Sequence, residues 1–496
     1  MGRHRTIARS GFRPRSIGCS TGPPMPAIDL LAIERGHISA PAGYGKTQLI
    51  ADSLAGHNAM RPVLVLTHTN GGVAALRKRL AKHGVSSDAY TLRTLDGWAL
   101  RLLSAYPSRA EIDIRHLDVT RPGQDYPEIQ RRVRGLVASG HIKDVLCASY
   151  SHVIVDEYQD CSLDQHAMIV GCAEVLPTVV LGDPMQSVFG FAGRRVDWND
   201  LPADFPEHHE LDTPWRWNNA KAPEIGRWLA CVRRALINRD PIDLNDVPAG
   251  VVWQRPGPSH QRRRSEAAAL RQLARAGSVL VIGPSAEANA RHDFARRNPG
   301  VTVVEPVELR RLAAFARNLN LDEPLNMIEE CARLARDVLT GLTRADVFRG
   351  RIERIHENGP GRFQLTEADQ AALGLIARPS YAAATALLQA LRASAQTRLF
   401  RPTIYNAALG ALSRASTGQV ESLSAATRAE RDVRRHQART VGKMAIGSTL
   451  LLKGLEADGC MIMNAHTLDR YDLYVALTRG AKGICIWSNS DTLEPA

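Results

Sequence analysis

The feature that most constrains the fold is a glycine-rich turn between a short apolar strand and a helix. A strand is predicted at Gly36–Ser39, and APAGYGKT follows it, with Ala40 where the general phosphate-loop pattern has its first glycine. Gly43 and Gly45 let backbone N–H groups curve around phosphate oxygens, and Lys46 places a positive charge on the β- and γ-phosphates. The helix that follows presents its positive end to the same phosphates. This order of elements predicts a nucleotide site in an α/β domain.

An acidic strand end lies downstream of this turn. Asp156 follows three apolar residues, so its carboxylate is expected at the C-terminal edge of a strand, facing the loop. Asp156 and the Thr47 hydroxyl are candidate magnesium ligands, and Glu157 is the candidate base for the attacking water. ATP and Mg²⁺ are therefore the expected cofactors. The predicted nucleotide-contacting residues around the loop are Ala40, Pro41, Ala42, Gly43, Tyr44, Gly45, Lys46, Thr47 and Gln48.

Short β-branched runs, each followed by a turn and a helical pattern, recur along the chain. Buried strands that alternate with helices indicate parallel sheets, so the predicted fold class is α/β. The early runs suit one domain and the later runs suit a second, within a chain of 496 residues. The predicted strand segments are 63–66, 153–155, 178–181, 279–282, 301–304, 460–463 and 484–487.

Two stretches are predicted to be helical inserts. Between about 305 and 440, the segments LRRLAAFARNL, MIEECARLARDVLTGL, YAAATALLQALRASAQ and TIYNAALGALSRA have apolar residues at three- and four-residue spacing. At about 104–148, Ile129, Val133 and Leu136 form one helical stripe. Each predicted α/β domain is thus interrupted by a mainly helical segment.

The charge balance bears on partners. A formal net charge of +12 fits a polyanion such as nucleic acid, and it fits equally a basic protein without such a partner. The arginine clusters at 262–264 and 431–439 favour solvated helix faces over phosphate-binding patches. The eight cysteines form no CxxC pair, which indicates a reduced, cytoplasmic protein. No apolar run of membrane-spanning length occurs, so no membrane partner is expected.

The first 24 residues hold five arginines and no acidic residue. Three interpretations stay open: a basic disordered arm, a transit peptide, or an extension that arises from a misassigned start, with the folded protein beginning at Met25.

With further motifs, the chain resembles the UvrD/Rep family of superfamily 1 helicases. Besides APAGYGKT (motif I) and VDEYQD (155–160, motif II), the similar segments are LTHTNGGVAAL (66–76, motif Ia), TLRTLDGWALRLL (91–103, the next DNA-contacting position), LGDPMQSVFGFAG (181–193, motif III), TPWRWN (213–218, motif IV), STLLLKGLEAD (448–458, motif V) and YVALTRG (474–480, motif VI). The resemblance implies two RecA-like P-loop NTPase domains with ATP between them. It also implies 3′→5′ movement on single-stranded DNA or DNA junctions, in repair, recombination or defence.

The resemblance also implies roles for single residues. Gln186 would sense the γ-phosphate, and Arg216 and Arg479 would be arginine fingers from the second domain. Glu456 would bind the ribose and Trp215 would stack on adenine. The implied DNA-contacting residues are His68, Thr69, Asn70, Phe189 and Phe191, of which the two phenylalanines would stack on bases.

The expected domain limits follow from the motif positions. They are 1–24 for the basic extension, 25–103 with 149–212 for the first RecA-like domain, 104–148 for its insert, 213–304 with 438–496 for the second domain, and 305–437 for the larger insert. The chain departs from the family at DNA-contacting positions, with His68, Ala192, Leu450 and Leu451 in place of the usual residue types, and the upstream glutamine that reads adenine is missing. Hydrolysis is therefore expected to be strong and unwinding by the isolated chain weak.

Three other functions can be compared with the same motifs. The chain could be a DNA-stimulated ATPase subunit beside a nuclease or another repair or defence protein, although it carries no visible nuclease motif. A P-loop kinase or GTPase would not need motifs III and VI, and a GTPase would carry an Asn-Lys-x-Asp guanine reader, which this sequence does not contain. A non-enzymatic DNA scaffold would predict a damaged phosphate loop, whereas Lys46, Asp156 and Glu157 are all present.

Overall fold

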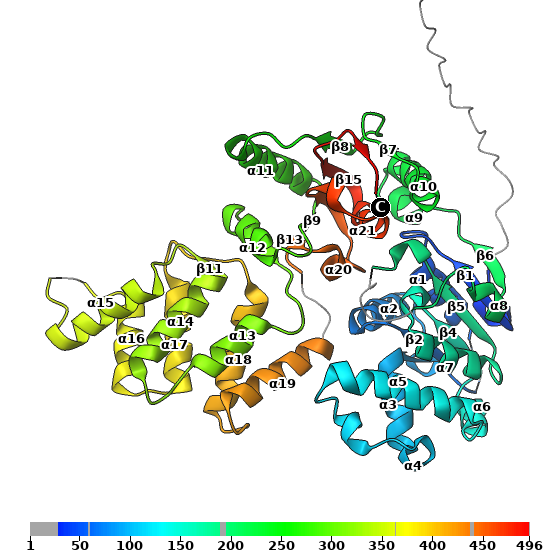
Figure 1. Ribbon diagram of the computed structural model, residues 1–496, viewed down its shortest axis with the longest axis horizontal. Coiled ribbons are helices and arrows are strands. Elements are labelled where there is room, and N and C mark those ends of the chain that lie inside the picture. Colours follow the sequence, from blue (N-terminus) through cyan, green and yellow to red (C-terminus); the bar gives the residue numbers. More distant parts are fainter. Residues whose placement is uncertain (1–27, 58–59, 189–194, 363, 437–440, 496) are drawn as a thin grey trace, which may run out of the picture.

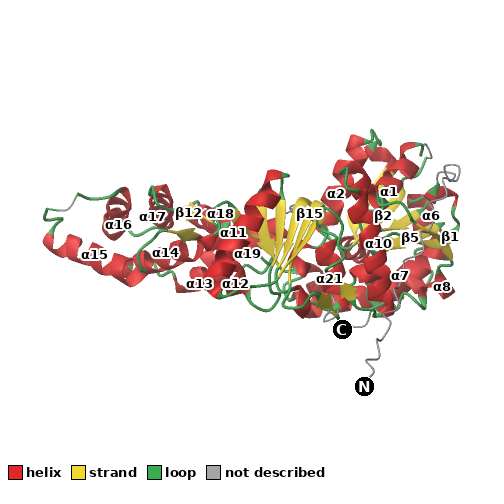
Figure 2. Cartoon of the chain, turned by 90° about the horizontal axis from the view of Figure 1, so that it is seen from above, coloured by secondary structure: helices red, strands yellow, loops and turns green. Residues whose placement is uncertain are grey.

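The computed structural model describes residues 28–57, 60–188, 195–362, 364–436 and 441–495. Two parallel sheets and a helical segment follow one another along the molecule, as Figures 1 and 2 show. The predicted α/β class with two parallel, RecA-like sheets is confirmed. Among the described residues, no helix has both the length and the apolar character that crossing a membrane requires.

The first sheet has the strand order β3-β2-β4-β5-β1-β6, with every neighbouring pair parallel. Its strands are β1 (Arg35–Ser39), β2 (Val63–Thr67), β3 (Tyr90–Thr94), β4 (Val153–Val155), β5 (Thr178–Gly182) and β6 (Glu207–Glu210). Its helices are α1 (Lys46–Ala55), α2 (Asn70–Lys82), α3 (Leu95–Ala105), α4 (Pro107–Ala110), α5 (Pro122–Ala138), α6 (Lys143–Ser149), α7 (Leu163–Ala173) and α8 (Leu201–Asp204). Only β5 separates β1 from β4, so the phosphate loop and Asp156 emerge at the same edge of the sheet.

Alternating side chains along β2 divide the first domain into two cores. Val63 and Val65 face one side of the sheet, and Leu64 and Leu66 face the other. The helical stripe of α5, which includes Ile129 and its neighbours, packs into the second of these cores. The helices of 104–148 therefore form a layer of the first domain and share its hydrophobic core.

The second sheet has the order β10-β13-β9-β14-β15-β8 and is also parallel throughout. Its strands are β8 (Val251–Gln254), β9 (Val279–Ile282), β10 (Val301–Val303), β13 (Met444–Gly447), β14 (Ala457–Ile462) and β15 (Gly480–Trp487). Its helices are α9 (Trp215–Asn219), α10 (Pro223–Asn238), α11 (Ser259–Arg275), α12 (Ala288–Arg297), α20 (Thr449–Leu452) and α21 (Arg470–Leu477). A short antiparallel pair, β7 (Ile242–Asp243) and β16 (Thr492–Leu493), lies beside it.

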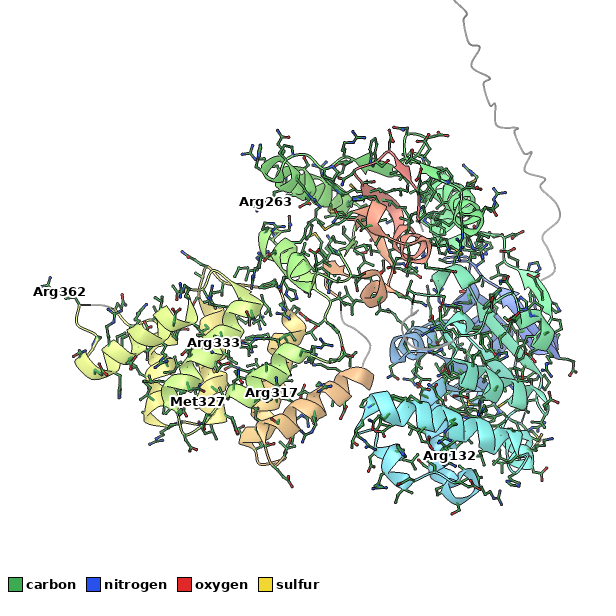
Figure 3. The ribbon with its side chains drawn as sticks, in the orientation of Figure 1. Arg132, Arg263, Arg317, Met327, Arg333 and Arg362 are labelled. Carbon is green, nitrogen blue, oxygen red and sulfur yellow. The ribbon has the colours of Figure 1, made fainter. Side chains whose placement is uncertain are left out.

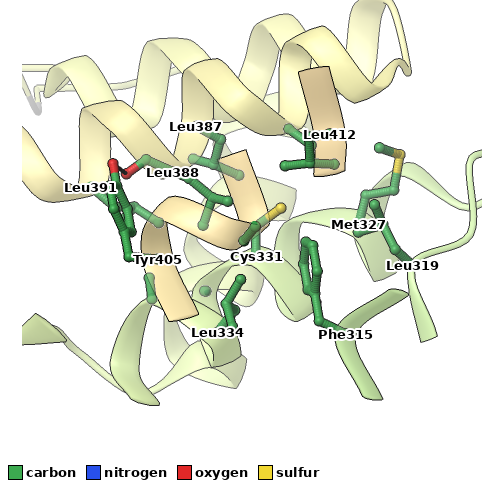
Figure 4. Close-up of a cluster of buried hydrophobic side chains, with 14 of the residues drawn as sticks. Phe315, Leu319, Met327, Cys331, Leu334, Leu387, Leu388, Leu391, Tyr405 and Leu412 are labelled. Atoms are coloured by element: carbon green, nitrogen blue, oxygen red, sulfur yellow. Dashed lines mark hydrogen bonds between the residues drawn. The ribbon is translucent and has the colours of Figure 1, made fainter. Parts of the chain in front are cut away.

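A helical segment lies between β10 and β13 in the sequence. Its helices are α13 (Arg310–Asn318), α14 (Pro324–Val338), α15 (Ala345–Asn358), α16 (Glu367–Ala377), α17 (Tyr381–Ala393), α18 (Pro402–Ser416) and α19 (Leu423–His436). Their apolar stripes meet in a separate core, which Figure 4 shows around Phe315, Cys331 and Leu387. The antiparallel pair β11 (Leu339–Thr340) and β12 (Arg398–Leu399) lies next to the second sheet.

Phe400 ties this helical segment to the second sheet. Its carbonyl accepts a hydrogen bond from Val303 N–H at 2.8 Å, and its side chain is buried in the core of that sheet. Nearby, Nη2 of Arg401 lies 3.1 Å from Oε2 of Glu305. The segment is thus fixed to β10 by packing and an ion pair as well as by its chain connections.

The first of the two arginine clusters lies on helix α11. Arg262 on α11 pairs with Glu266 at 2.7 Å, while Arg263 is exposed at the outer side of that helix (Figure 3). Arg439 lies outside the described residues.

Candidate nucleotide site

The phosphate loop has the backbone shape that its glycines permit. Gly43 and Gly45 have φ angles of 78° and 93°, in the left-handed region that other residues rarely adopt. Helix α1 begins at Lys46, and the N–H groups of its first turn have no acceptor within the helix. The loop therefore offers backbone donors and a helix N-terminus to an anion.

Helix α9 lies against this loop and leaves no room for larger residues in it. A Cβ atom at Gly43 would come within 2.8 Å of the Trp217 ring, and one at Gly45 within 3.0 Å of Trp215. The N–H of Arg216 donates to the Gly43 carbonyl at 3.0 Å. Trp217 is fully buried, whereas Trp215 is 53% exposed and stands beside the loop.

Lys46 joins the loop to the acidic strand end. Its Nζ lies 3.0 Å from Oδ1 of Asp156 and 2.6 Å from Oε1 of Glu157. Burial works against the charge of Lys46, but the two carboxylates outweigh it and raise the pKa of this lysine. Burial raises the pKa of Asp156, while Lys46 and Lys453 overcome burial and lower the pKa of Glu157 to about 2. Glu157 is therefore ionised at neutral pH.

Gln159, for which no separate role was predicted, orients the candidate base. Its Nε2 donates to Oε2 of Glu157 at 2.6 Å, and its Oε1 accepts the N–H of Asp183 at 3.0 Å. It belongs to the short 3₁₀ helix η4 (Tyr158–Asp160), which directly follows Glu157. This amide thus connects the ends of β4 and β5.

Asp183, also without an assigned role, organises the loop after β5. Its carboxylate accepts hydrogen bonds from the Ala42 N–H at 3.1 Å and from Nε2 of Gln186 at 3.1 Å. The Ala42 N–H also lies 3.2 Å from the Tyr474 hydroxyl of the second domain. Within the predicted nucleotide-contacting set, the Ala42 donor is thus already engaged by protein groups.

Residues from the second domain complete the site. Arg479 is 2% exposed, and its guanidinium donates to the carbonyls of Val475 at 2.8 Å and Leu455 at 3.0 Å. Its Nη2 lies 3.5 Å from Oε1 of Gln186, across the boundary between the domains. Burial, aided by the charge of Arg216, lowers the pKa of Arg479 to about 10, so it stays protonated at neutral pH.

Arg216 and Glu456 form a pair on the same side. Arg216 Nη1 donates to the Thr478 carbonyl at 2.6 Å, and Nη2 pairs with the Glu456 carboxylate. Although burial opposes it, Arg216 lowers the pKa of Glu456. The structure therefore brings together Lys46, Asp156, Glu157, Gln186, Arg216, Glu456 and Arg479 around one inter-domain boundary.

Thr47 and Asp156 have the chemistry that a magnesium site needs. A hydroxyl and a carboxylate are hard oxygen ligands, and magnesium bound with a nucleotide needs one or two such groups in addition to phosphate oxygens and water. Thr47 is on the first turn of α1. Asp156 pairs with Lys46, which directly precedes Thr47 in the chain. These two residues fit the predicted metal position.

The predicted DNA-contacting residues have mixed placements. His68 is partly buried after β2, and burial, opposed by Asp96, lowers its pKa to about 4. The Thr69 hydroxyl caps α2 by accepting the Gly72 N–H at 3.0 Å, and Asn70 is the first residue of that helix. The remaining positions, Phe189, Phe191 and Ala192, lie outside the described residues.

Comparisons with known proteins cover part of the chain. A family model described as an AAA domain matches residues 27–192, which contain the phosphate loop, Asp156 and Gln186. No curated protein sequence matches the chain. Among solved structures, the nonstructural protein 10 helicase of an arterivirus, in complex with DNA, is similar at 14% sequence identity and a TM-score of 0.27. That match covers 56% of this chain and 54% of the viral one, so this chain spans about half the length of that helicase.

Proposed function

We propose that this chain, with its AAA domain at 27–192, hydrolyses ATP between its two RecA-like domains and uses the cycle to move 3′→5′ along single-stranded DNA. The observation that carries the proposal is the meeting of Lys46 and Glu157 from the first domain with Arg479 from the second. Hydrolysis of a phosphoanhydride needs positive charge on the phosphates and a base for the water. The inter-domain boundary supplies both.

In this scheme, Lys46 and the first turn of α1 bind the phosphates. Because Lys46 is paired with Glu157 at 2.6 Å, phosphate oxygens would compete with that carboxylate for the lysine. Transfer of Lys46 to the phosphates would take positive charge away from Glu157 and make it more basic. Gln159 would keep Glu157 oriented while it accepts a proton from the attacking water. Magnesium, held by Thr47 and Asp156, would supply charge neutralisation at the phosphates.

The second domain would contribute transition-state charge. The planar guanidinium cations of Arg479 and Arg216 suit the equatorial oxygens of the phosphoryl group that is transferred. Carbonyls of the second domain and Glu456 hold the two guanidinium groups in place, and Arg479 in addition contacts Gln186 of the first domain. Trp215, half-exposed beside Gly45, would stack on adenine. Closure of the domains on ATP would thereby assemble the site, and opening after hydrolysis would release it.

The motif pattern at 66–76, 181–193 and 448–458 supports both DNA as the partner and the direction of movement. The net charge of +12 also fits a DNA partner. From the same pattern we infer a role in DNA repair, recombination or defence. Steady-state phosphate release with and without a single-stranded oligonucleotide tests the ATPase. Strand displacement from duplexes with a 3′ or a 5′ single-stranded tail tests the polarity. Displacement from 5′-tailed duplexes alone would contradict the proposed direction.

A further inference from the structure

The side chain of Lys453 reaches across the boundary between the two RecA-like domains. This lysine lies in the motif V segment 448–458, but the residue roles and the chemistry proposed above do not include it. It directly follows α20 of the second domain. Its Nζ lies 2.5 Å from Oδ2 of Asp160 and 2.6 Å from the backbone carbonyl of Gln186. Both acceptors belong to the first domain, one in η4 after β4 and the other in the 3₁₀ helix η5 (Pro184–Gln186) after β5.

Burial makes this contact dependent on the position of the domains. The side chains of Lys453 and Asp160 are 9% and 2% exposed. A buried charge is costly unless an opposite charge and hydrogen bonds accompany it. Arg195 of the first domain is another cation near Asp160, with Nη1 3.5 Å from Oδ1 of that carboxylate. Separation of the domains would leave Asp160 with Arg195 and remove its closest cation.

The two acceptors of Lys453 are attached to the groups that carry the proposed chemistry. Asp160 is adjacent to Gln159, whose amide holds Glu157 at 2.6 Å. The side chain of Gln186 lies 3.5 Å from Nη2 of Arg479. One ammonium group thus fixes both loops that bear the base and the arginine contact.

We propose that Lys453 is an inter-domain positioning residue, which holds η4 and η5 of the first domain so that Glu157 and Gln186 are in place only when the second domain is docked. This inference rests on the proposed function. It adds a residue that touches no reacting atom and acts through Asp160 and the Gln186 carbonyl. Lysine suits the role because its compact ammonium can satisfy two acceptors from one point.

The first test compares Lys453→Ala with a matched lysine. Lys482 also pairs with an aspartate, with Nζ 2.7 Å from Oδ1 of Asp458, but both residues belong to the second domain. In the full chain, we expect Lys453→Ala to lower kcat for ATP about tenfold, with KM within about threefold, because it disturbs the assembled site more than nucleotide binding. Lys482→Ala should keep the wild-type kcat. An unchanged kcat in Lys453→Ala, or an equal loss in Lys482→Ala, would overturn the proposal.

A double variant separates positioning from simple charge balance. Lys453→Ala leaves Asp160 buried without its lysine, and the additional change Asp160→Ala removes that cost. If Lys453 only balanced buried charge, the double variant would recover the wild-type kcat, which would overturn the proposal. Positioning predicts that the double variant stays as slow as Lys453→Ala. Should Lys453→Ala fail to fold, Lys453→Gln, which keeps a donor for the Gln186 carbonyl but loses the positive charge, is compared with Lys482→Gln. A lower kcat in Lys453→Gln alone would support the positioning role, and equal kcat values would overturn it.

Hydrogen exchange gives a readout that does not depend on hydrolysis. In Lys453→Ala, backbone amides of 158–161 and 185–187 should exchange faster than in the wild type, while those of α1 should not change. Unchanged exchange in both loops would overturn the positioning role. If the wild-type chain releases no phosphate at all, the proposed function fails, and the exchange result still decides whether Lys453 holds the two loops.

Discussion

The Nζ atom of Lys46 lies 2.6 Å from Oε1 of Glu157, so the phosphate-loop cation and the proposed catalytic base form an ion pair. The pair explains why the pKa of Glu157 is lowered to about 2 although burial acts in the opposite direction. When a phosphate group pairs with Lys46 in place of Glu157, the pKa of Glu157 should rise, which makes this carboxylate more basic. Predictions about turnover follow from this arrangement.

Replacement of the base should separate binding from hydrolysis. Glu157→Gln keeps the size and hydrogen-bonding shape of the side chain but cannot accept the water proton. We expect ATP binding to remain and turnover to fall by about 100-fold or more. Calorimetric titration with ATP and a phosphate-release assay measure the two quantities. Normal turnover in this variant would show that another group acts as the base.

Removal of an arginine from the second domain should affect the transition state more than the bound substrate. Arg479→Ala should lower kcat by about 1000-fold, because a guanidinium at the phosphoryl group acts mainly on developing charge. Arg263→Ala, at an exposed position on α11, is the matched control and should keep wild-type turnover. ATP affinity should change little in either variant. A wild-type kcat for Arg479→Ala would exclude it as an arginine finger.

His68 should make the stability of the protein depend on pH. Burial lowers its folded-state pKa to about 4 from 6.5, so between these values the unfolded chain binds a proton that the folded chain does not. The free energy of unfolding should therefore fall as the pH drops from 6.5 towards 4, by up to about 1.4 kcal/mol per pH unit from this group. Urea unfolding at pH 7 and pH 5 should show a smaller drop for His68→Gln than for the wild type. Equal drops would place the titrating group elsewhere.

Unwinding by the isolated chain should be weak. The helices of 104–148 are packed into the first-domain core. Leu451, at a position where the resemblance to motif V implies a DNA contact, is buried in the second-domain core. Each base-pair step costs about 1.4 kcal/mol to open, and a motor that holds the strand loosely loses that work. Strand displacement should therefore lag far behind ATP hydrolysis in the same reaction. Processive separation of long duplexes by the chain alone would contradict this expectation.

The sequence predicted strands where buried β-branched residues stand together, as in β2, β5 and β9. It missed β6, because Glu207–Glu210 has no apolar residue and forms an exposed edge next to β1. It also missed β3 and β13, which have mixed compositions and become strands by pairing with β2, β9 and β10. The hydrophobic pattern thus missed three of the four edge strands, β3, β6 and β8, and also β13, which lies between β10 and β9.

The motifs named the residue types around the phosphates but not the contacts between the domains. Tyr474 contacts Ala42, and Lys453 contacts Asp160, across hundreds of residues of sequence. Such pairs depend on how two separately folded sheets dock, and no local spacing encodes that geometry. Gln159 could have been found, since an amide two residues after an acidic pair can reach back to it.

We propose above that the two domains hydrolyse ATP, and we expect single-stranded DNA to stimulate this hydrolysis. The decisive measurement is phosphate release by the wild-type chain with and without an oligothymidine strand. The Lys46→Ala variant is the negative control that gives the background rate. We expect phosphate release well above the Lys46→Ala level and a clear increase on addition of the strand. Release no greater than that of Lys46→Ala, or the same rate with and without DNA, would contradict it.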